Sequence, residues 1–141
     1  MTNRITPLHR ALGVLDGTLA DLLPAALAQT VAEDEDLDWK RELPHTSNPN
    51  GMLELATDFA AMANTSGGLI VYGVGEAAEG NAADQFVSVV GDSAAVDQRL
   101  HQAAYRAQPP ITGMMVEPVT LVSGEQLYAV HIDASTWFPT W

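Results

Sequence analysis

The segment AAMANTSGGLIVYGV, residues 60–74, carries the clearest structural signal in the sequence. It completes a stretch from Met52 to Ala63 whose apolar residues recur every three or four positions, which predicts an amphipathic helix. Asn and Gly readily adopt the left-handed backbone of a helix terminus, so residues 64–68 are expected to end this helix. The continuous apolar run 69–74 then predicts a central strand that is buried on both faces.

The segments on either side predict the remaining elements. Polarity alternates from Leu37 to Arg41, which is typical of a short strand with Trp39 facing inward. Further along we expect loops at 44–51 and 75–84, a strand at 85–90, a helix from Asp92 or Ser93 to about Ala107, and a hairpin of 114–122 with 127–132. The sequence therefore predicts an α/β (α+β) fold, a mixed β-sheet with two main helices.

Residues 1–32 predict an N-terminal helical arm in front of a domain that spans 33–141. Its leucines recur in steps of four and three, as on one helix face: Leu8, Leu12, Leu15, Leu19 and Leu22. Because Gly13, Asp16 and Gly17 interrupt this stripe, we expect two short helices that meet near residues 16–18, with Thr18 capping the second. The arm either packs on its own domain or forms a homodimer contact.

The C-terminal segment TWFPTW, residues 136–141, is a second candidate for a homodimer contact. Each of its three large aromatic side chains would lose ~1.5–3 kcal/mol of burial energy if it stayed in water. The segment is therefore expected to pack on the domain, to meet another copy, or to lead into more chain.

Composition excludes several classes of protein. No apolar stretch approaches the ~20 residues that a membrane-spanning helix needs. There is no cysteine, which excludes disulfides, thiolate nucleophiles and cysteine-based zinc sites. With no signal-peptide pattern at the N-terminus, we expect a cytoplasmic protein without membrane contact. The net charge of −12 repels polyanions, so nucleic-acid binding would need a local basic patch, a metal ion or a partner.

Two motifs resemble those of the Schlafen AlbA-type domain family. One is Glu33-x-x-x-Leu37-Asp38-Trp39-Lys40, and the other is Ala-Asn-Thr-x-Gly-Gly at 63–68 with the apolar strand after it. The likeness extends over about 33–139 and leaves the arm aside. It implies a DNA- or RNA-binding module that is often fused to other domains in bacterial regulatory or defence proteins. In eukaryotic relatives, a trio of carboxylates supports metal-dependent cleavage of structured RNA.

The resemblance assigns candidate catalytic and metal-binding residues. Glu33 matches the first acid of the trio, and Asp38 stands where the family has its second, a glutamate. The third position falls on Gly75, with Glu76 one residue later. Carboxylates within reach of one another hold Mg²⁺ or Mn²⁺, which activates water and neutralises phosphate charge. The alternative is a solvated acidic run that keeps a sheet edge soluble.

Four basic residues are the candidates for phosphate contacts. Lys40 and Arg41 end the first predicted strand, whereas Arg99 and Arg106 lie on the polar face of the second main helix together with Gln102. The alternative is ordinary helix solubility, with ion pairs to Asp97 and other acids.

Nucleotide binding, suggested by an older description of the family as a divergent ATP-binding domain, is disfavoured. Phosphate loops run from a strand into a helix, whose N-terminal amides face the anion. Here a helix runs into the loop 64–68 and presents its carbonyl end. Three functions remain: a nucleic-acid-binding module, which we rank first, a protein-interaction or oligomerisation domain, and a metal-dependent nuclease. On its own the domain is expected to bind rather than to catalyse.

Overall fold

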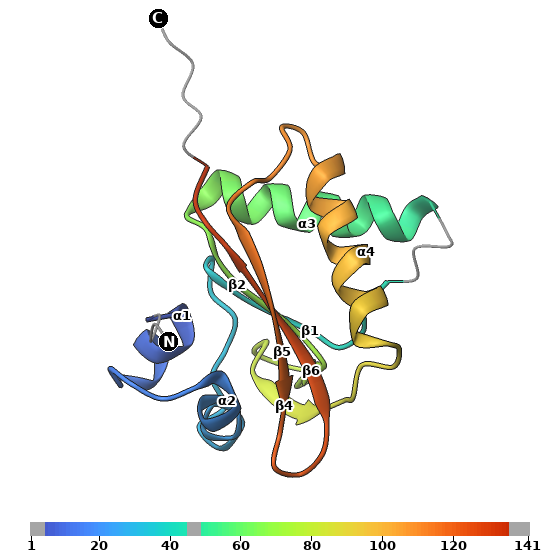
Figure 1. The fold of residues 1–141 in the computed structure, drawn as a ribbon. Coiled ribbons are helices and arrows are strands. Elements are labelled where there is room, and N and C mark those ends of the chain that lie inside the picture. The colour runs from blue at the N-terminus through green and yellow to red at the C-terminus, as the bar shows by residue number, and fades with distance from the viewer. Residues whose placement is uncertain (1–4, 45–48, 136–141) are drawn as a thin grey trace, which may run out of the picture.

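The structure, a computed structural model, describes residues 5–44 and 49–135. Its centre is a four-stranded mixed sheet (Figure 1). The strand order is β1 (Leu37–Lys40), β2 (Gly68–Tyr72), β6 (Gln126–Ile132) and β5 (Met114–Thr120). β1 runs parallel to β2, and β6 is antiparallel to both β2 and β5. The predicted mixed sheet and its C-terminal hairpin are confirmed.

Helices cover both faces of this sheet (Figure 1). One face carries the two main helices, α3 (Pro49–Thr65) and α4 (Ser93–Arg106). The other carries the short helices of the arm, α1 (Pro7–Leu12) and α2 (Leu19–Ala28). Each face buries its own apolar cluster, because β2 and β6 alternate their side chains between the two sides.

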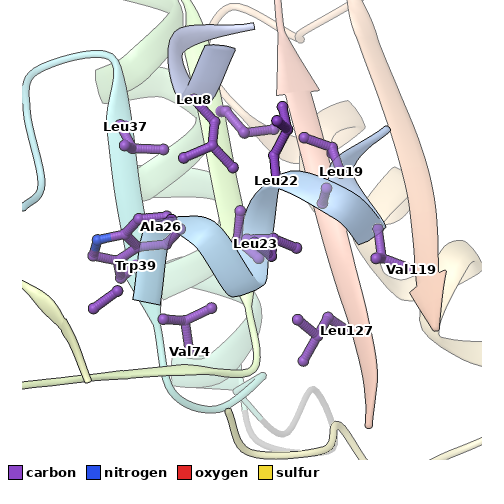
Figure 2. Packing of buried hydrophobic residues seen from close by; sticks show 14 of the residues in the cluster. Leu8, Leu19, Leu22, Leu23, Ala26, Leu37, Trp39, Val74, Val119 and Leu127 are labelled. Atoms are coloured by element: carbon purple, nitrogen blue, oxygen red, sulfur yellow. The ribbon is translucent and has the colours of Figure 1, made fainter. Parts of the chain in front are cut away.

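The arm packs on its own sheet. Leu8, Leu22, Leu23 and Ala26 are buried against the side chains of β1, β2 and β6 in one cluster, whose Trp39 is 1% exposed (Figure 2). Between arm and sheet lie Leu37, Leu69, Val71, Val74, Leu127 and Ala129. The leucine stripe is thus used within the chain. A homodimer contact through the arm has no support in these contacts, and one through residues 136–141 lies outside the described residues.

The arm forms two short helices, as predicted, but the stripe is interrupted between them. Gly13 caps the end of α1 with φ of 72°, and Thr18 caps the start of α2 by accepting a hydrogen bond from the Asp21 amide. Leu15 lies in the connection and is 84% exposed, so its predicted place in the apolar stripe is wrong. Helical periodicity does not apply to Leu15, because α1 ends at Leu12 and α2 begins at Leu19.

The predicted strand 69–74 is divided at Gly73. β2 ends at Tyr72, and the chain continues as β3 (Val74–Glu76), which pairs with β4 (Ala83–Phe86) in a separate two-stranded ribbon. Gly73 has φ of 108°, and a Cβ there would lie 2.4 Å from a Leu127 methyl. Only glycine fits this bend.

Other boundaries move by a few residues. The strand predicted at 85–90 is β4, which begins earlier and ends at Phe86, so the predicted loop 75–84 contains strand residues at both ends. α3 begins at Pro49 rather than Met52, because proline is well suited to the first turn of a helix. Within the described ranges, no helix is long and apolar enough to cross a membrane.

Candidate functional site

Glu33 and Asp38 come together at the β1 edge of the sheet. The backbone amide of Trp39 donates to Glu33 Oε2 at 2.9 Å, which folds the residues before β1 back over the strand. In this position the carboxyl of Glu33 lies near Asp38, which influences its pKa. Asp38 alternates along β1 with the buried Leu37 and Trp39, so it lies on the side of the strand opposite the arm cluster.

Burial and neighbouring acids raise the pKa of Glu33. Its partial burial, the hydrogen bond to Asp38 and the nearby negative charges of Asp38 and Glu76 raise its pKa to about 8, although the Trp39 amide opposes this shift. A nearby negative charge disfavours ionisation of a carboxyl, and burial acts in the same direction.

Lys40 lies between two acids. Its Nζ is 3.4 Å from Asp38 Oδ2 and 3.6 Å from Oδ2 of Asp58, which comes from α3. Burial alone would lower the pKa of Lys40, but the two carboxylates together raise it. For Asp58, burial raises the pKa, and the positive charge of Lys40 opposes this shift. The lysine is thus neutralised locally, and Asp58 is a member of the cluster that the sequence analysis did not include.

Gly75, where the resemblance predicts the third acid, lies beside the guanidinium of Arg41. A Cβ added to Gly75 would meet Gln85 Cγ at 2.9 Å and the guanidinium Nη1 of Arg41 at 3.1 Å. Arg41 therefore lies close to the backbone of β3 at Gly75. Glu76, one residue on, is exposed and acts on Glu33 only through its charge.

The described residues do not meet the requirement for a metal centre. No group of three or more acidic or histidine side chains among them is arranged to hold a metal ion. The raised pKa of Glu33 and the Lys40 ammonium beside Asp38 both oppose the binding of Mg²⁺ or Mn²⁺ by these two side chains. The pKa of Glu33 responds to the charges of both Asp38 and Glu76, and the catalytic role of the predicted trio remains a prediction.

The acidic residues border a shallow groove of about 350 Å³ between β1 and α3. Its lining combines five carboxylates with the side of α3: Glu33, Asp34, Glu35, Leu37, Asp38, Asp58, Ala61, Met62 and Thr65. Tyr72 lies behind it in the core, with a buried hydroxyl that has no hydrogen-bond partner among the described residues. Burial, with Asp58, Asp38 and Glu54 nearby, raises the Tyr72 pKa well above its ordinary value.

The candidate basic residues are divided between two elements. Arg41 follows β1 and is exposed, whereas Arg99 and Arg106 lie on α4, half-buried and exposed respectively. Asp97, which the sequence offered as a partner for these arginines, instead lies 3.5 Å from His101. None of the three arginines forms an ion pair with a carboxylate in the described part of the chain.

These features define an α+β domain whose sheet edge carries an acidic groove and whose second main helix carries free arginines. A family model described as Schlafen, AlbA_2 matches residues 33–139, and the chain belongs to this family. The family assignment made from the two sequence motifs is confirmed. The matched range omits the arm, which nevertheless supplies much of one core cluster.

Two solved structures share the fold at low sequence identity. The DIP2311 protein of Corynebacterium diphtheriae is 20% identical, with a TM-score of 0.50 over 81% of this chain and 22% of that protein. The N-terminal domain of a protein described as related to the ATP-dependent DNA helicase RecG, from Nitrosomonas europaea, is 19% identical, with a TM-score of 0.51 over 87% of this chain and 82% of that domain. No curated protein matches the chain. The chain thus spans about a fifth of the first of these proteins.

Proposed function

We propose that this chain is a nucleic-acid-binding domain that does not cleave its ligand, within a larger bacterial regulatory or defence protein. Membership of the Schlafen AlbA_2 family supports the link to nucleic acids. The likeness to a domain from a helicase-related protein agrees with it, and the small share of DIP2311 that is covered agrees with a module inside longer chains.

The observation that carries the proposal is the availability of three arginines. Arg41, Arg99 and Arg106 have no carboxylate partner among the described residues, so their guanidinium groups are available for bidentate contacts with phosphates. Tyr105 precedes Arg106 and is 78% exposed, which provides a ring on which an unpaired base can stack. Lys40 is left out of the proposed interface, because Asp38 and Asp58 already neutralise it.

The acidic groove argues against cleavage. Phosphodiester hydrolysis by a two-acid or three-acid site depends on a divalent ion, and the described residues lack a group arranged to hold one. The guanidinium of Arg41 beside Gly75 adds positive charge at the position of the family's third acid. A phosphate would meet an arginine there instead of a metal.

Fluorescence anisotropy with labelled single-stranded RNA and duplex DNA at several salt concentrations tests the proposal. We expect binding that weakens with salt, and the double variant Arg99→Ala/Arg106→Ala should flatten the salt slope by about 0.7–0.9 per lost phosphate contact. Arg10→Ala is the matched control, since it removes an arginine that is bound to Asp36 on the arm side. Absence of binding, or equal slopes for the double variant and the control, would contradict the proposal.

The same ligands incubated with Mn²⁺ or with EDTA separate binding from cleavage. We expect intact nucleic acid on denaturing gels in both conditions. Cleavage that needs Mn²⁺ and disappears in Glu33→Ala and in Asp38→Ala would show instead that the paired acids form a nuclease centre.

An interaction or oligomerisation domain remains the second candidate, because two basic side chains are paired internally and the chain as a whole is strongly acidic. Arg10 and Lys40 are both bound to carboxylates, and the net charge is −12. If no nucleic acid binds at low salt, light scattering of the purified chain and a search for a cationic protein partner become the relevant experiments.

A further inference from the structure

A pocket of about 410 Å³ lies where the C-terminal half of α3, the segment that follows α4 and the chain after β6 meet (Figure 1). Its apolar walls come mainly from α3 and from the segment after α4: Ala60, Ala63, Pro109, Pro110 and Ile111. The pocket shares no lining residue with the acidic groove. Its volume falls within the ~300–1,000 Å³ range of pockets that bury small molecules.

Backbone hydrogen bonds hold the three walls together. The Ser135 amide donates to the Ala63 carbonyl at 2.7 Å, which ties the chain after β6 to the last turns of α3. The Asp133 amide donates to the Gly113 carbonyl, also at 2.7 Å, and so joins the same chain to the segment after α4. The pocket is therefore formed before anything occupies it, which lowers the entropy lost on binding.

The pocket adjoins one of the proposed phosphate contacts. Arg106 is the last residue of α4, and Pro109 of the pocket wall follows it by three residues, so their Cα atoms are at most roughly 11 Å apart. The Ile111 amide donates to the Ala104 carbonyl at 2.9 Å, which folds the wall back onto the last turn of α4. A strand held through a phosphate at Arg106 thus carries its nearest bases to this end of α4.

The lining fits a nucleobase better than a phosphate. None of the described residues that line the pocket is basic, and Asp133 contributes a carboxylate, so an anion is disfavoured. Prolines and alanines instead offer apolar surface to the faces of a ring. The amide of Asn64 has the donor and acceptor that pair with N7 and N6 of adenine, and a carboxylate accepts from an exocyclic amino group. Thymine presents a carbonyl in place of that amino group.

We propose that this pocket binds one unpaired adenine of a single strand whose phosphates contact the arginines of α4. The inference rests on the proposed function and adds a base preference to it. A base within a duplex is stacked and paired, whereas an unpaired base is free to turn into a pocket. The phosphate contacts set the affinity common to all strands, and the pocket distinguishes between strands of equal charge.

Fluorescence anisotropy of the full chain with labelled oligothymidylates of one length tests the base pocket. One strand is all thymine, the second carries a single central adenine, and the third carries a single central abasic nucleotide. We expect the adenine strand to bind on the order of tenfold more tightly than the other two. All three should have the same salt slope, because their phosphates are equal in number.

A variant of the α3 wall locates the base. Ala60→Leu narrows the pocket and should remove the preference for the adenine strand without changing the salt slope. Thr57→Leu is the matched control, exposed on α3 outside the pocket, and should keep the preference. Should circular dichroism show that Ala60→Leu is misfolded, Thr112→Leu on the opposite wall replaces it with the same expected result.

Each alternative outcome overturns the base pocket, and the salt slope tells its failure from that of the proposed function. Salt-dependent binding with equal affinity for all three strands excludes the pocket and leaves the proposed function in place. No binding of any strand excludes both. A preference for adenine that survives Ala60→Leu, or that Thr57→Leu also removes, shows that the base is bound elsewhere.

Discussion

The two faces of the central sheet bury different kinds of side chain. On the arm face, the buried polar side chains of the described residues have partners: Trp39 Nε1 donates to the Val31 carbonyl at 2.9 Å, and His9 is bound to Thr6 and to the Gly17 carbonyl. On the face covered by α3 and α4, Tyr72 and Tyr128 lie side by side, and neither hydroxyl has a hydrogen-bond partner within the described residues. Among the described residues, the buried polar side chains of the arm face are thus hydrogen-bonded, whereas two buried hydroxyls of the other face are not.

This contrast separates stability from function within one small sheet. Apolar burial with satisfied polar groups contributes stability, whereas an unsatisfied buried hydroxyl opposes it. The unsatisfied face is also the one beside Asp58, Lys40 and the acidic groove. We infer that the arm stabilises the sheet, so that the other face can hold polar groups that are energetically unfavourable.

The largest effect is expected from the arm. Leu23→Ala removes a side chain of α2 that is 1% exposed in the core cluster, and we expect a loss of about 2–5 kcal/mol in the free energy of unfolding. Urea unfolding followed by far-UV circular dichroism should show one transition at a lower midpoint. Leu15→Ala, at an exposed position of the arm, is the control and should change stability little. A separate early transition would show that the arm is an independent unit.

A smaller effect of opposite sign is expected on the other face. Tyr72→Phe deletes a buried hydroxyl that lacks a partner among the described residues, and we expect the free energy of unfolding to rise by roughly 1 kcal/mol. Thermal and urea unfolding measure this change. Tyr105→Phe, at an exposed position on α4, should have no effect. Destabilisation by Tyr72→Phe would show that the Tyr72 hydroxyl is bonded in solution, which would leave only the Tyr128 hydroxyl to distinguish the two faces among the described residues.

The sequence predicted the helices better than the site. Periodicity predicts α2, α3 and α4, and Thr18 is a predicted cap, because these signals lie within a few neighbouring residues. The bend at Gly73 depends on Leu127, which is distant in sequence, and glycine alone did not reveal it. Asp58 was visible only as a polar residue of a helix, since its approach to Lys40 requires the packing of α3 on β1.

Family resemblance indicates Glu33 and Asp38 as candidate residues, but it does not predict the raised pKa of Glu33. An acidic run in a sequence suggests full ionisation, but the fold brings two of its carboxyls into hydrogen-bonding contact and partly buries Glu33. Proximity and desolvation are both properties of tertiary structure. For the same reason, the position of Arg41 over Gly75 could not be read from their separation in the sequence.

The raised pKa of Glu33 predicts a pH dependence of stability. Because its pKa rises from 4.5 to about 8 on folding, the native state binds more protons than the unfolded state between these values, and this group's contribution to stability falls as pH rises through that window. Glu33→Gln should flatten the decline and be more stable near the upper end by on the order of 1 kcal/mol, since solvent screens a partly exposed group. Unfolding measured across the window, with Glu79→Gln as control, checks this. An unchanged pH profile in Glu33→Gln would mean that the carboxyl is ionised at neutral pH.

The smallest effect is expected where the arm meets the domain through charge. Arg10 of α1 pairs with Asp36, but the arginine side chain is 59% exposed, and exposed ion pairs contribute only about 0–1 kcal/mol. Arg10→Ala and Asp36→Ala, alone and combined, should give a coupling energy at the low end of that range, reduced further by salt. If the coupling rivals the loss in Leu23→Ala, the arm is held by electrostatics rather than by its buried leucines. A small coupling energy would mean that the apolar cluster holds the arm on the sheet. The packing of the arm would then not depend on the ionic strength at which nucleic-acid binding is measured.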